Sequence, residues 1–392
     1  MKNLFLILFT ALILFCSCSN DTSNNTPIID VKSVIGKGAI HNTSEFIKDI
    51  KYVPLETGPN SIVGDIKKIV VMNNRIYVSD NQGKISIFDM SGRILNTLTR
   101  KGRGPQEYVD ITDYTVDPKG NIFILASRDG IIEYDNDMKF VRKLNFESDN
   151  NNIFHLDISL IKEGLFASNI INYGTIRQQA LTIYDDTLKV LVSYDTEVVT
   201  LDYASITIMP YNHYVYDGDM TIYRRVSDTI FNINIKNNYS KSVKYVLDYG
   251  GYALTEEIVK SKHERESNSI SLTGLIEAEH YLFMIFDFYE MAPESFDIFS
   301  YLKNTYVYAV YDKKKGVCVL LNQPIPRSFG LNDDLTGNLP FWPKTITQDQ
   351  KLVSWYNAVT LISLAEEGKI DKSLAANLKE DDNPVIVIAT PK

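Results

Sequence analysis

A pattern of short strands that repeats after 46 residues limits what this chain can fold into. Ile76-Tyr77-Val78 is matched 46 positions later by Ile122-Phe123-Ile124, and Phe88-Asp89 is matched at the same offset by Tyr134-Asp135. Within each unit, apolar residues alternate at a spacing of two and are interrupted by Asn, Asp and Gly turns, which is typical of antiparallel strands. Each unit therefore predicts about four short strands.

Weaker copies of the unit follow along the chain, around Tyr184, Phe231, Tyr311 and Trp355. Six such units account for the chain. A four-stranded sheet cannot bury both of its faces alone, whereas six sheets packed radially cover one another. We therefore predict an all-β fold, a six-bladed β-propeller of four-stranded antiparallel blades, over residues 29–392.

Two strand-like segments at the ends of this region are candidates for closing the ring. They are "IKYVPLET" at 50–57 and "NPVIVIATPK" at 383–392, and we expect both in the last blade. In the second segment, Val385, Val387 and Ala389 should face one side, and Ile386 and Ile388 the other.

Short helices are expected as additions to the blades. Residues 254–266 read as a helix with Thr255 as N-cap, and residues 358–367 as a helix stopped at Gly368. A further helix should begin after Asp371. We expect the 358–367 helix to pack against the ring through its apolar residues, which are Val359, Leu361, Ile362, Leu364 and Ala365.

The N-terminus has the charge and hydrophobicity pattern of an export signal. Lys2 precedes an apolar run from Leu4 to Cys16 that is too short to span a bilayer. The "FCSCSND" that follows resembles the lipobox of bacterial lipoproteins, so we predict a signal peptide at 1–17, an acylated Cys18 and a flexible tether at 18–28. The alternative is an ordinary secretory signal peptide, in which Cys18 is not lipidated.

Cysteine content and charge exclude several classes of protein. With Cys16 in the signal peptide and Cys18 acylated, only Cys318 remains, which excludes a disulfide scaffold and a Cys-ligated metal site. The net charge of −9 and the isoelectric point near 5.2 argue against nucleic acid or a polybasic membrane surface as partner. Membrane attachment would therefore depend on the lipid.

The glycine-rich stretch "RKGRGPQEY" at 100–108 is the candidate ligand-binding loop. It lacks the second glycine, Lys and hydroxyl of a phosphate-binding loop, and Glu107 stands where a dinucleotide fold needs its third glycine. The strand-like "VDITDYTVD" that follows offers no helix N-terminus to an anion. Both nucleotide interpretations therefore fail.

Two interpretations of this loop remain. The first is a rigid crossover between blades, with Gly102 and Gly104 at positive φ, Glu107 paired with a neighbouring arginine and Tyr108 packed inward. The second is ligand binding by Arg100, Lys101 and Arg103, because such a crossover also ends near the channel mouth, where propellers commonly bind ligands.

Several of these segments together resemble the six-bladed β-propeller lipoproteins of Bacteroidetes. They are the lipoprotein signal, "IKYVPLET", "RKGRGPQEY", "LPFWPKTI" and "NPVIVIATPK". The resemblance implies a propeller anchored in the cell envelope, in the outer membrane, and it implies no established activity. "DTL" at 186–188 and "DTI" at 228–230 also resemble the O-glycosylation triplet of that group, which makes Thr187 and Thr229 candidate modification sites.

No motif of catalysis is evident. The five histidines, at 41, 155, 213, 263 and 280, show no metal-ligand spacing, and no G-x-S-x-G elbow is present. Our first hypothesis is a non-catalytic module without a cofactor, which binds a glycan, peptide or envelope protein. The second is a metal-dependent lyase or lactonase-like hydrolase with a divalent ion in the channel. The third is an envelope sensor paired with a transporter.

Overall fold

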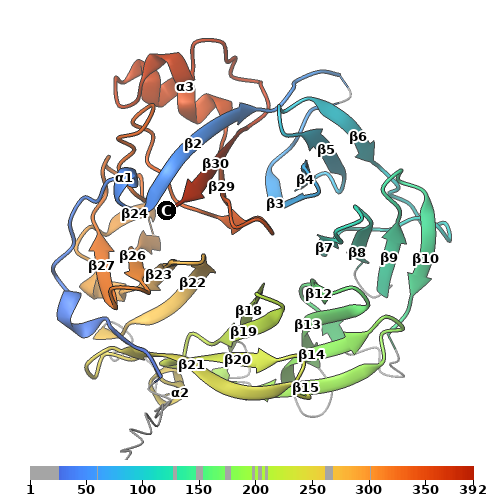
Figure 1. Cartoon of the computed structure of the whole chain (residues 1–392), viewed down its shortest axis with the longest axis horizontal. Coiled ribbons are helices and arrows are strands. Elements are labelled where there is room, and N and C mark those ends of the chain that lie inside the picture. Colours follow the sequence, from blue (N-terminus) through green and yellow to red (C-terminus); the bar gives the residue numbers. More distant parts are fainter. Residues whose placement is uncertain are drawn as a thin grey trace, which may run out of the picture.

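The computed structural model describes residues 26–392 except 60, 127–129, 147–152, 173–177, 197–198, 202–204, 208–210, 261–267 and 301. Six antiparallel sheets stand around one central axis, as Figure 1 shows looking along it. The predicted six-bladed propeller is confirmed. Alternate strand residues face the two neighbouring blades, so the cores lie between sheets.

The first two blades are regular four-stranded sheets, with the first strand innermost. Blade 1 consists of β3 (Ile66–Met72), β4 (Arg75–Asp80), β5 (Ile85–Asp89) and β6 (Ile94–Leu98). Blade 2 consists of β7 (Asp113–Val116), β8 (Ile122–Ala126), β9 (Gly130–Tyr134) and β10 (Phe140–Leu144).

The next two blades each have a fifth strand. Blade 3 consists of β11 (Ile153–His155), β12 (Ser159–Lys162), β13 (Leu165–Asn172), β14 (Gln178–Asp185) and β15 (Val190–Thr196), and both β11 and β12 pair with β13. Blade 4 consists of β18 (Asn212–Tyr216), β19 (Asp219–Tyr223), β20 (Thr229–Asn234) and β21 (Ser240–Asp248), extended on its outer edge by β1 (Ile28–Asp30). A hairpin of β16 (Val199–Leu201) and β17 (Ser205–Thr207) lies between these blades in sequence.

The last two blades return to four strands. Blade 5 consists of β22 (Ser271–Glu277), β23 (Tyr281–Asp287), β26 (Tyr306–Asp312) and β27 (Val317–Leu321), with a hairpin of β24 (Phe296–Phe299) and β25 (Leu302–Asn304) inserted. Blade 6 consists of β28 (Thr345–Ile346), β29 (Leu352–Tyr356), β30 (Val385–Pro391) and β2 (Ile47–Pro54).

Strand pairing between the two ends of the propeller closes the ring, as predicted. β2 is the outermost strand of blade 6 and pairs antiparallel with β30, so that Tyr52 lies opposite Val387. Val385, Val387 and Ala389 pack into one core, and Ile386 and Ile388 into the next. The alternation expected from the sequence is therefore confirmed.

The segment before β2 crosses the outside of blade 5, a feature that the repeat does not predict (Figure 1). It begins with Ile28, placed by prediction at the end of the tether, which pairs with Val246 of blade 4 in parallel. It then bridges to blade 5 at Leu321 through Ala39. The helix α1 (Thr43–Phe46) leads into β2.

The recurring aromatic-Asp pair has a structural reason. Asp89, Asp185 and Asp312 end β5, β14 and β26, and Asp135 directly follows β9. One carboxylate oxygen of each accepts hydrogen bonds from two backbone N–H groups of the following turn. The preceding aromatic residue is buried in every case. The repeat thus marks the turn into the outermost strand.

The helices lie at the periphery of the ring. α2 (Glu256–Lys260) falls within the predicted 254–266 helix, and its Ile258 N–H donates to Thr255 Oγ1 at 3.2 Å. α3 (Ala358–Glu366) ends before Gly368, at φ +69°, and buries Leu361 and Ala365, although Val359 is exposed. The 3-10 turns η1 (Lys32–Val34), η3 (Tyr289–Met291) and η4 (Lys372–Leu374) are also present, the last capped by Asp371. In the part of the chain that is described, no helix is long and apolar enough to cross a membrane.

The order of strands defines two faces of the ring. Because strands alternate in direction, every link from an outermost strand to the next innermost strand lies on one face, which we call the connection face. The "RKGRGPQEY" loop, the start of β7 and the start of β28 all lie on it. The turns after the innermost strands lie on the opposite face.

Candidate functional site

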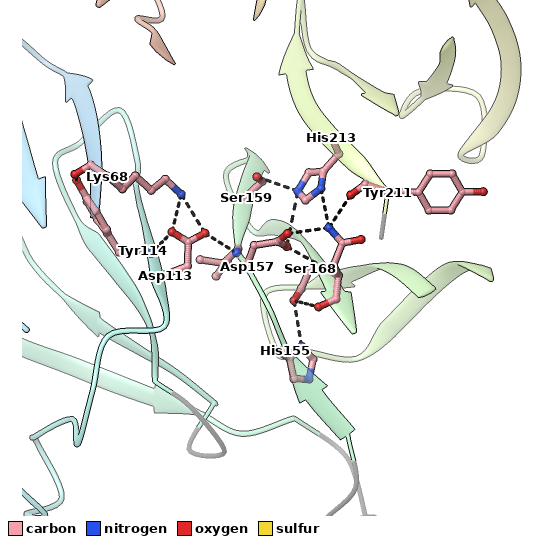
Figure 2. A network of polar contacts seen from close by, with 11 residues as sticks. Lys68, Asp113, Tyr114, His155, Asp157, Ser159, Ser168, Tyr211 and His213 are labelled. Atoms are coloured by element: carbon pink, nitrogen blue, oxygen red, sulfur yellow. Dashed lines mark hydrogen bonds and ion pairs between the residues drawn. The ribbon is translucent and has the colours of Figure 1, made fainter. Parts of the chain in front are cut away.

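A belt of polar side chains joins the innermost strands of blades 1 to 4 near the connection face (Figure 2). In its first half, Lys68 Nζ of β3 lies 2.8 and 3.0 Å from the two carboxylate oxygens of Asp113, at the start of β7. Asp113 Oδ2 also accepts from the Ile158 N–H of blade 3 at 2.9 Å. One carboxylate therefore connects three blades.

The second half of the belt connects blades 3 and 4. Asp157 accepts from the Asn169 backbone N–H at 2.8 Å and from its Nδ2 at 2.7 Å. Asn169 Nδ2 also lies 2.8 Å from the Tyr211 carbonyl oxygen and 3.3 Å from His213 Nδ1. His213 Nε2 lies 3.0 Å from Ser159 Oγ, and the His213 side chain is only 4% exposed.

The geometry of His213 and Ser159 differs from that of a serine hydrolase. Ser159 Oγ faces Nε2 of His213, whereas Nδ1 faces the Asn169 amide, both of whose N–H groups already donate to Asp157 and to the Tyr211 carbonyl. A catalytic triad also needs a carboxylate on Nδ1, whereas Asp157 Oδ1 lies 4.0 Å from Nε2. These contacts hold the inner strands together rather than activate a nucleophile.

A second histidine in the belt is held neutral. His155 Nδ1 lies 3.1 Å from Ser168 Oγ, and its ring stacks on Phe146 with centroids 3.5 Å apart. Burial lowers the pKa of His155 to about 4. It therefore carries no charge at neutral pH.

Metal binding finds little support in these residues. Across the described residues, no three His, Cys, Asp or Glu side chains lie close enough together to bind an ion. The belt carboxylates Asp113 and Asp157 already accept several hydrogen bonds each.

Blade 6 contributes a cation to the same face. Lys344 directly precedes β28, the innermost strand, and its backbone N–H donates to the Val353 carbonyl. Its Nζ donates to the Trp355 carbonyl at 3.0 Å and lies 4.3 Å from the centroid of the Trp355 ring. The side chain is exposed, yet the protein surrounds Nζ closely enough that burial lowers the pKa of Lys344 to about 8.

The predicted ligand-binding loop is tightly folded around Tyr108. Tyr108 is fully buried, and its hydroxyl donates to the Gly83 carbonyl at 3.1 Å. Its backbone N–H donates to the Arg100 carbonyl, and its carbonyl accepts from Gly102. Arg100, Lys101 and Arg103 are exposed on the surface of this loop.

Two details of the predicted crossover need correction. Gly102 and Gly104 do not have positive φ; instead, a side chain at Gly102 would place its Cβ 1.9 Å from Glu107 Oε2. Glu107 forms no ion pair with an arginine within the described residues. Its carboxylate instead accepts a hydrogen bond from the Gly104 N–H at 2.8 Å. The glycines make room for this carboxylate.

The other predicted sites lie apart from the belt. Thr187 is exposed in the turn after β14, and Thr229 is half-buried at the start of β20; each hydroxyl donates to a nearby Asp at 2.7 Å. Cys18 lies outside the described residues.

A buried ion cluster on the opposite face was not predicted either. Glu277, at the end of β22, lies 2.5 Å from Lys244 Nζ and 2.6 Å from Lys313 Nζ, and accepts from the Tyr214 hydroxyl at 2.7 Å. Burial opposes ionisation of Glu277, but the two ammonium groups outweigh it and hold its pKa below the usual value. The cluster joins blades 4 and 5.

The residues of the belt do show a pattern in the sequence: residues in contact are separated by about one repeat. Lys68 and Asp113 are 45 positions apart, as are Asp113 and Ile158, and Asn169 and His213 are 44 apart. Residues about one repeat apart in the sequence are therefore brought into contact between adjacent blades. Lys344 lies within "LPFWPKTI", one of the segments that carry the family resemblance.

Comparison with known proteins identifies the family. The family model described as a domain of unknown function, DUF4934, matches residues 26–390. The chain belongs to this family. No curated protein is significantly similar to it.

Two solved structures resemble this DUF4934 protein over most of its length. A protein described as exported, from Bacteroides fragilis, is 17% identical with a TM-score of 0.63, and the match covers 93% of this chain and 99% of that one. A DUF4221 member from Bacteroides vulgatus is 8% identical with a TM-score of 0.50, covering 88% and 97%. At these identities the likeness shows the fold, a propeller shared with Bacteroides proteins.

Proposed function

We propose that this DUF4934 protein is a non-catalytic module that binds a glycan, peptide or protein partner on its connection face. The observation that carries the proposal is the belt: its carboxylates and His213 are engaged with side chains and backbone of adjacent blades. Such contacts give a rigid platform and leave no activated nucleophile among them. The proposal requires no cofactor.

We further propose that the protein is exported and held at the outer membrane by a lipid on Cys18. The apolar leader, the lipobox-like "FCSCSND" and the similarity to a protein described as exported support this. Mass spectrometry of the chain extracted from membranes should find acylation at Cys18, and C18S should move the protein into the soluble fraction. An unmodified Cys18 in membrane-bound protein would contradict the anchor.

Binding is tested with the full chain on arrays of envelope glycans and peptides. The expected result is a retained ligand that mass spectrometry recovers unchanged, and weaker binding by the double variant Arg100→Ser, Arg103→Ser at an unchanged unfolding midpoint. A ligand converted to product would contradict the non-catalytic proposal. Unfolding of the double variant would show that these arginines act only in the crossover.

A further inference from the structure

An apolar hairpin lies outside the sheet of blade 5, on the connection face. It consists of β24 and β25, which among the described residues pair only with each other, and it is inserted between β23 and β26, which end and begin on that face. Its side chains Ile298, Phe299 and Leu302 are 46%, 57% and 46% exposed. Phe299 lies opposite Leu302 in the pairing, so both are on one face of the hairpin. Large apolar side chains gathered in this way mark an interaction surface.

The base of the hairpin is fixed to the propeller. Phe296, the first residue of β24, stacks on Phe329 with ring centroids 5.6 Å apart, and Phe329 contacts the ring of Tyr308 edge-on at 4.9 Å. The Phe288 N–H donates to the Thr305 carbonyl at 3.1 Å, which joins the two chain segments below the hairpin. The exposed residues are therefore held in place by the body of the protein.

The N-terminal segment crosses blade 5 beside the start of this hairpin. The Ala39 carbonyl accepts from the Asn322 N–H at 2.8 Å, and the next residue, Gln323, donates its backbone N–H to the Glu294 carboxylate at 2.7 Å. Glu294 lies two residues before β24. Ile40, which follows Ala39, is 56% exposed. The N-terminal segment and the hairpin therefore share the connection-face rim of blade 5.

The same segment leads to the proposed lipid anchor. Ile28, which begins β1 on the outer edge of blade 4, is 62% exposed. The ten residues from Cys18 to Pro27 span about 35 Å at most. A lipid on Cys18 would therefore keep the rim of blades 4 and 5 close to the bilayer, whereas blades 1 and 2 lie across the ring (Figure 1).

The order of side chains along the hairpin fits a membrane interface. Ile298, Phe299 and Leu302 lie near its turn. Tyr306, which is 43% exposed, lies at its base, where the Arg327 guanidinium is 5.6 Å from the centroid of an aromatic ring. Tyr and Arg are favoured at the level of the lipid headgroups, whereas aliphatic and Phe side chains reach the acyl chains.

The two strands of the hairpin are also electrically neutral, unlike the chain as a whole. Their charged residues are Asp297 and Lys303, which are cross-strand partners. The net charge of the chain is −9, so its general surface is repelled by anionic lipids. A neutral apolar hairpin avoids this repulsion, and its binding to a bilayer should need no anionic lipid.

We propose that the β24–β25 hairpin inserts into the surface of the bilayer that carries the Cys18 lipid. The inference rests on the proposed anchor and adds a second contact, which fixes the orientation of the ring. The rim of blades 4 and 5 then faces the lipid, and the loop at 100–108, between blades 1 and 2, stays accessible to a partner. Because the outer strand edges need water for their backbone groups, the hairpin enters only the interfacial layer.

A spin label on the hairpin tests the insertion directly. Phe299→Cys is labelled with a nitroxide in the lipidated full chain, which is then reconstituted into phosphatidylcholine vesicles. Cys318 should not compete for the label, because it is 5% exposed and burial raises the pKa of its thiol to about 12. We expect the label to be accessible to dissolved oxygen and shielded from an aqueous nickel chelate. The same label on Lys119→Cys, on the opposite face of blade 2, should remain accessible to the chelate.

Flotation tests the hairpin without the anchor. The soluble C18S chain should float with phosphatidylcholine vesicles at low and high salt alike. Replacing Ile298, Phe299 and Leu302 together by serine should reduce the bound fraction roughly tenfold or more, because the apolar area that enters the lipid is lost. The matched control is the triple variant Leu95→Ser, Val141→Ser, Val190→Ser, which removes exposed apolar side chains from the outermost strands of blades 1 to 3 and should leave flotation unchanged.

Three results would overturn the inference. They are a label at position 299 that the chelate reaches in vesicles, equal flotation of C18S with and without the three serines, and shielding of the label by a second copy or another protein in the absence of lipid. If the serine variant unfolds, the label alone decides. If the label stays in water while the chain remains in the vesicles, the anchor stands and only the hairpin contact is wrong. If the label is shielded but Cys18 is unmodified, the anchor is wrong and the hairpin contact stands.

Discussion

Replacing Glu277 by glutamine should destabilise the propeller strongly. The Glu277 side chain is 1% exposed, and the ammonium groups of Lys244 and Lys313 that it contacts are on side chains 18% and 17% exposed. A glutamine keeps the shape but presents an N–H₂ group to one of the two ammonium groups and leaves the buried positive charge uncompensated. Breaking a buried ion pair in this way costs about 3–5 kcal/mol.

This cost is a large fraction of the stability of a typical domain, which is about 5–15 kcal/mol. Urea unfolding followed by circular dichroism measures it as a fall in midpoint at an unchanged slope. The matched control is Glu163→Gln, because Glu163 also contacts a lysine between two blades but its side chain is 75% exposed. The control should leave the midpoint unchanged.

The effect should also depend on pH. Because the pKa of Glu277 is lower in the folded protein than its ordinary value of 4.5, its contribution is complete above that value and is lost as the pH falls through the folded-state pKa. The difference between wild type and Glu277→Gln should therefore shrink in acid. Equal midpoints for Glu277→Gln and Glu163→Gln at neutral pH would refute the reasoning.

Two further substitutions test ring closure and the loop. The pair Asp49→Cys and Thr390→Cys places cysteines on paired positions of β2 and β30, and an oxidised bond there should raise the unfolding free energy by up to about 5 kcal/mol relative to the reduced protein; failure to cross-link would contradict the closure. Gly102→Ala should cost about 0.5–1.5 kcal/mol in thermal unfolding, because the Glu107 carboxylate must move away and lose the Gly104 N–H, and in a Glu107→Ala background the same change should cost little further. Additive costs in that double variant would show that the clash is not the cause.

The architecture could be predicted because it depends on features that are local and repeated. The aromatic-Asp pairs mark turns, so Phe88-Asp89 and Tyr134-Asp135 gave the period directly. The apolar residues at 385–389 could be assigned to the two faces of β30, because successive side chains of a strand point to opposite faces of the sheet. The pairing of Ile28 with blade 4 was not predictable in this way, because it follows no repeat.

The axial residues were missed because their contacts are between blades. Lys68 and Asp113 meet only when two innermost strands are side by side, and neither forms a motif within its own strand. The positive φ predicted for Gly102 is wrong. The sequence alone does not show whether a glycine is needed for a positive φ angle or because a Cβ atom has no room. Here the space is taken by the Glu107 carboxylate.

Metal analysis tests most directly the claim that the connection face binds a ligand and performs no chemistry. The full chain, purified without chelator, should contain far less than one divalent ion per molecule by elemental analysis. About one tightly held ion per chain, lost when Asp157 is replaced by asparagine, would contradict the account and favour a metal-dependent enzyme.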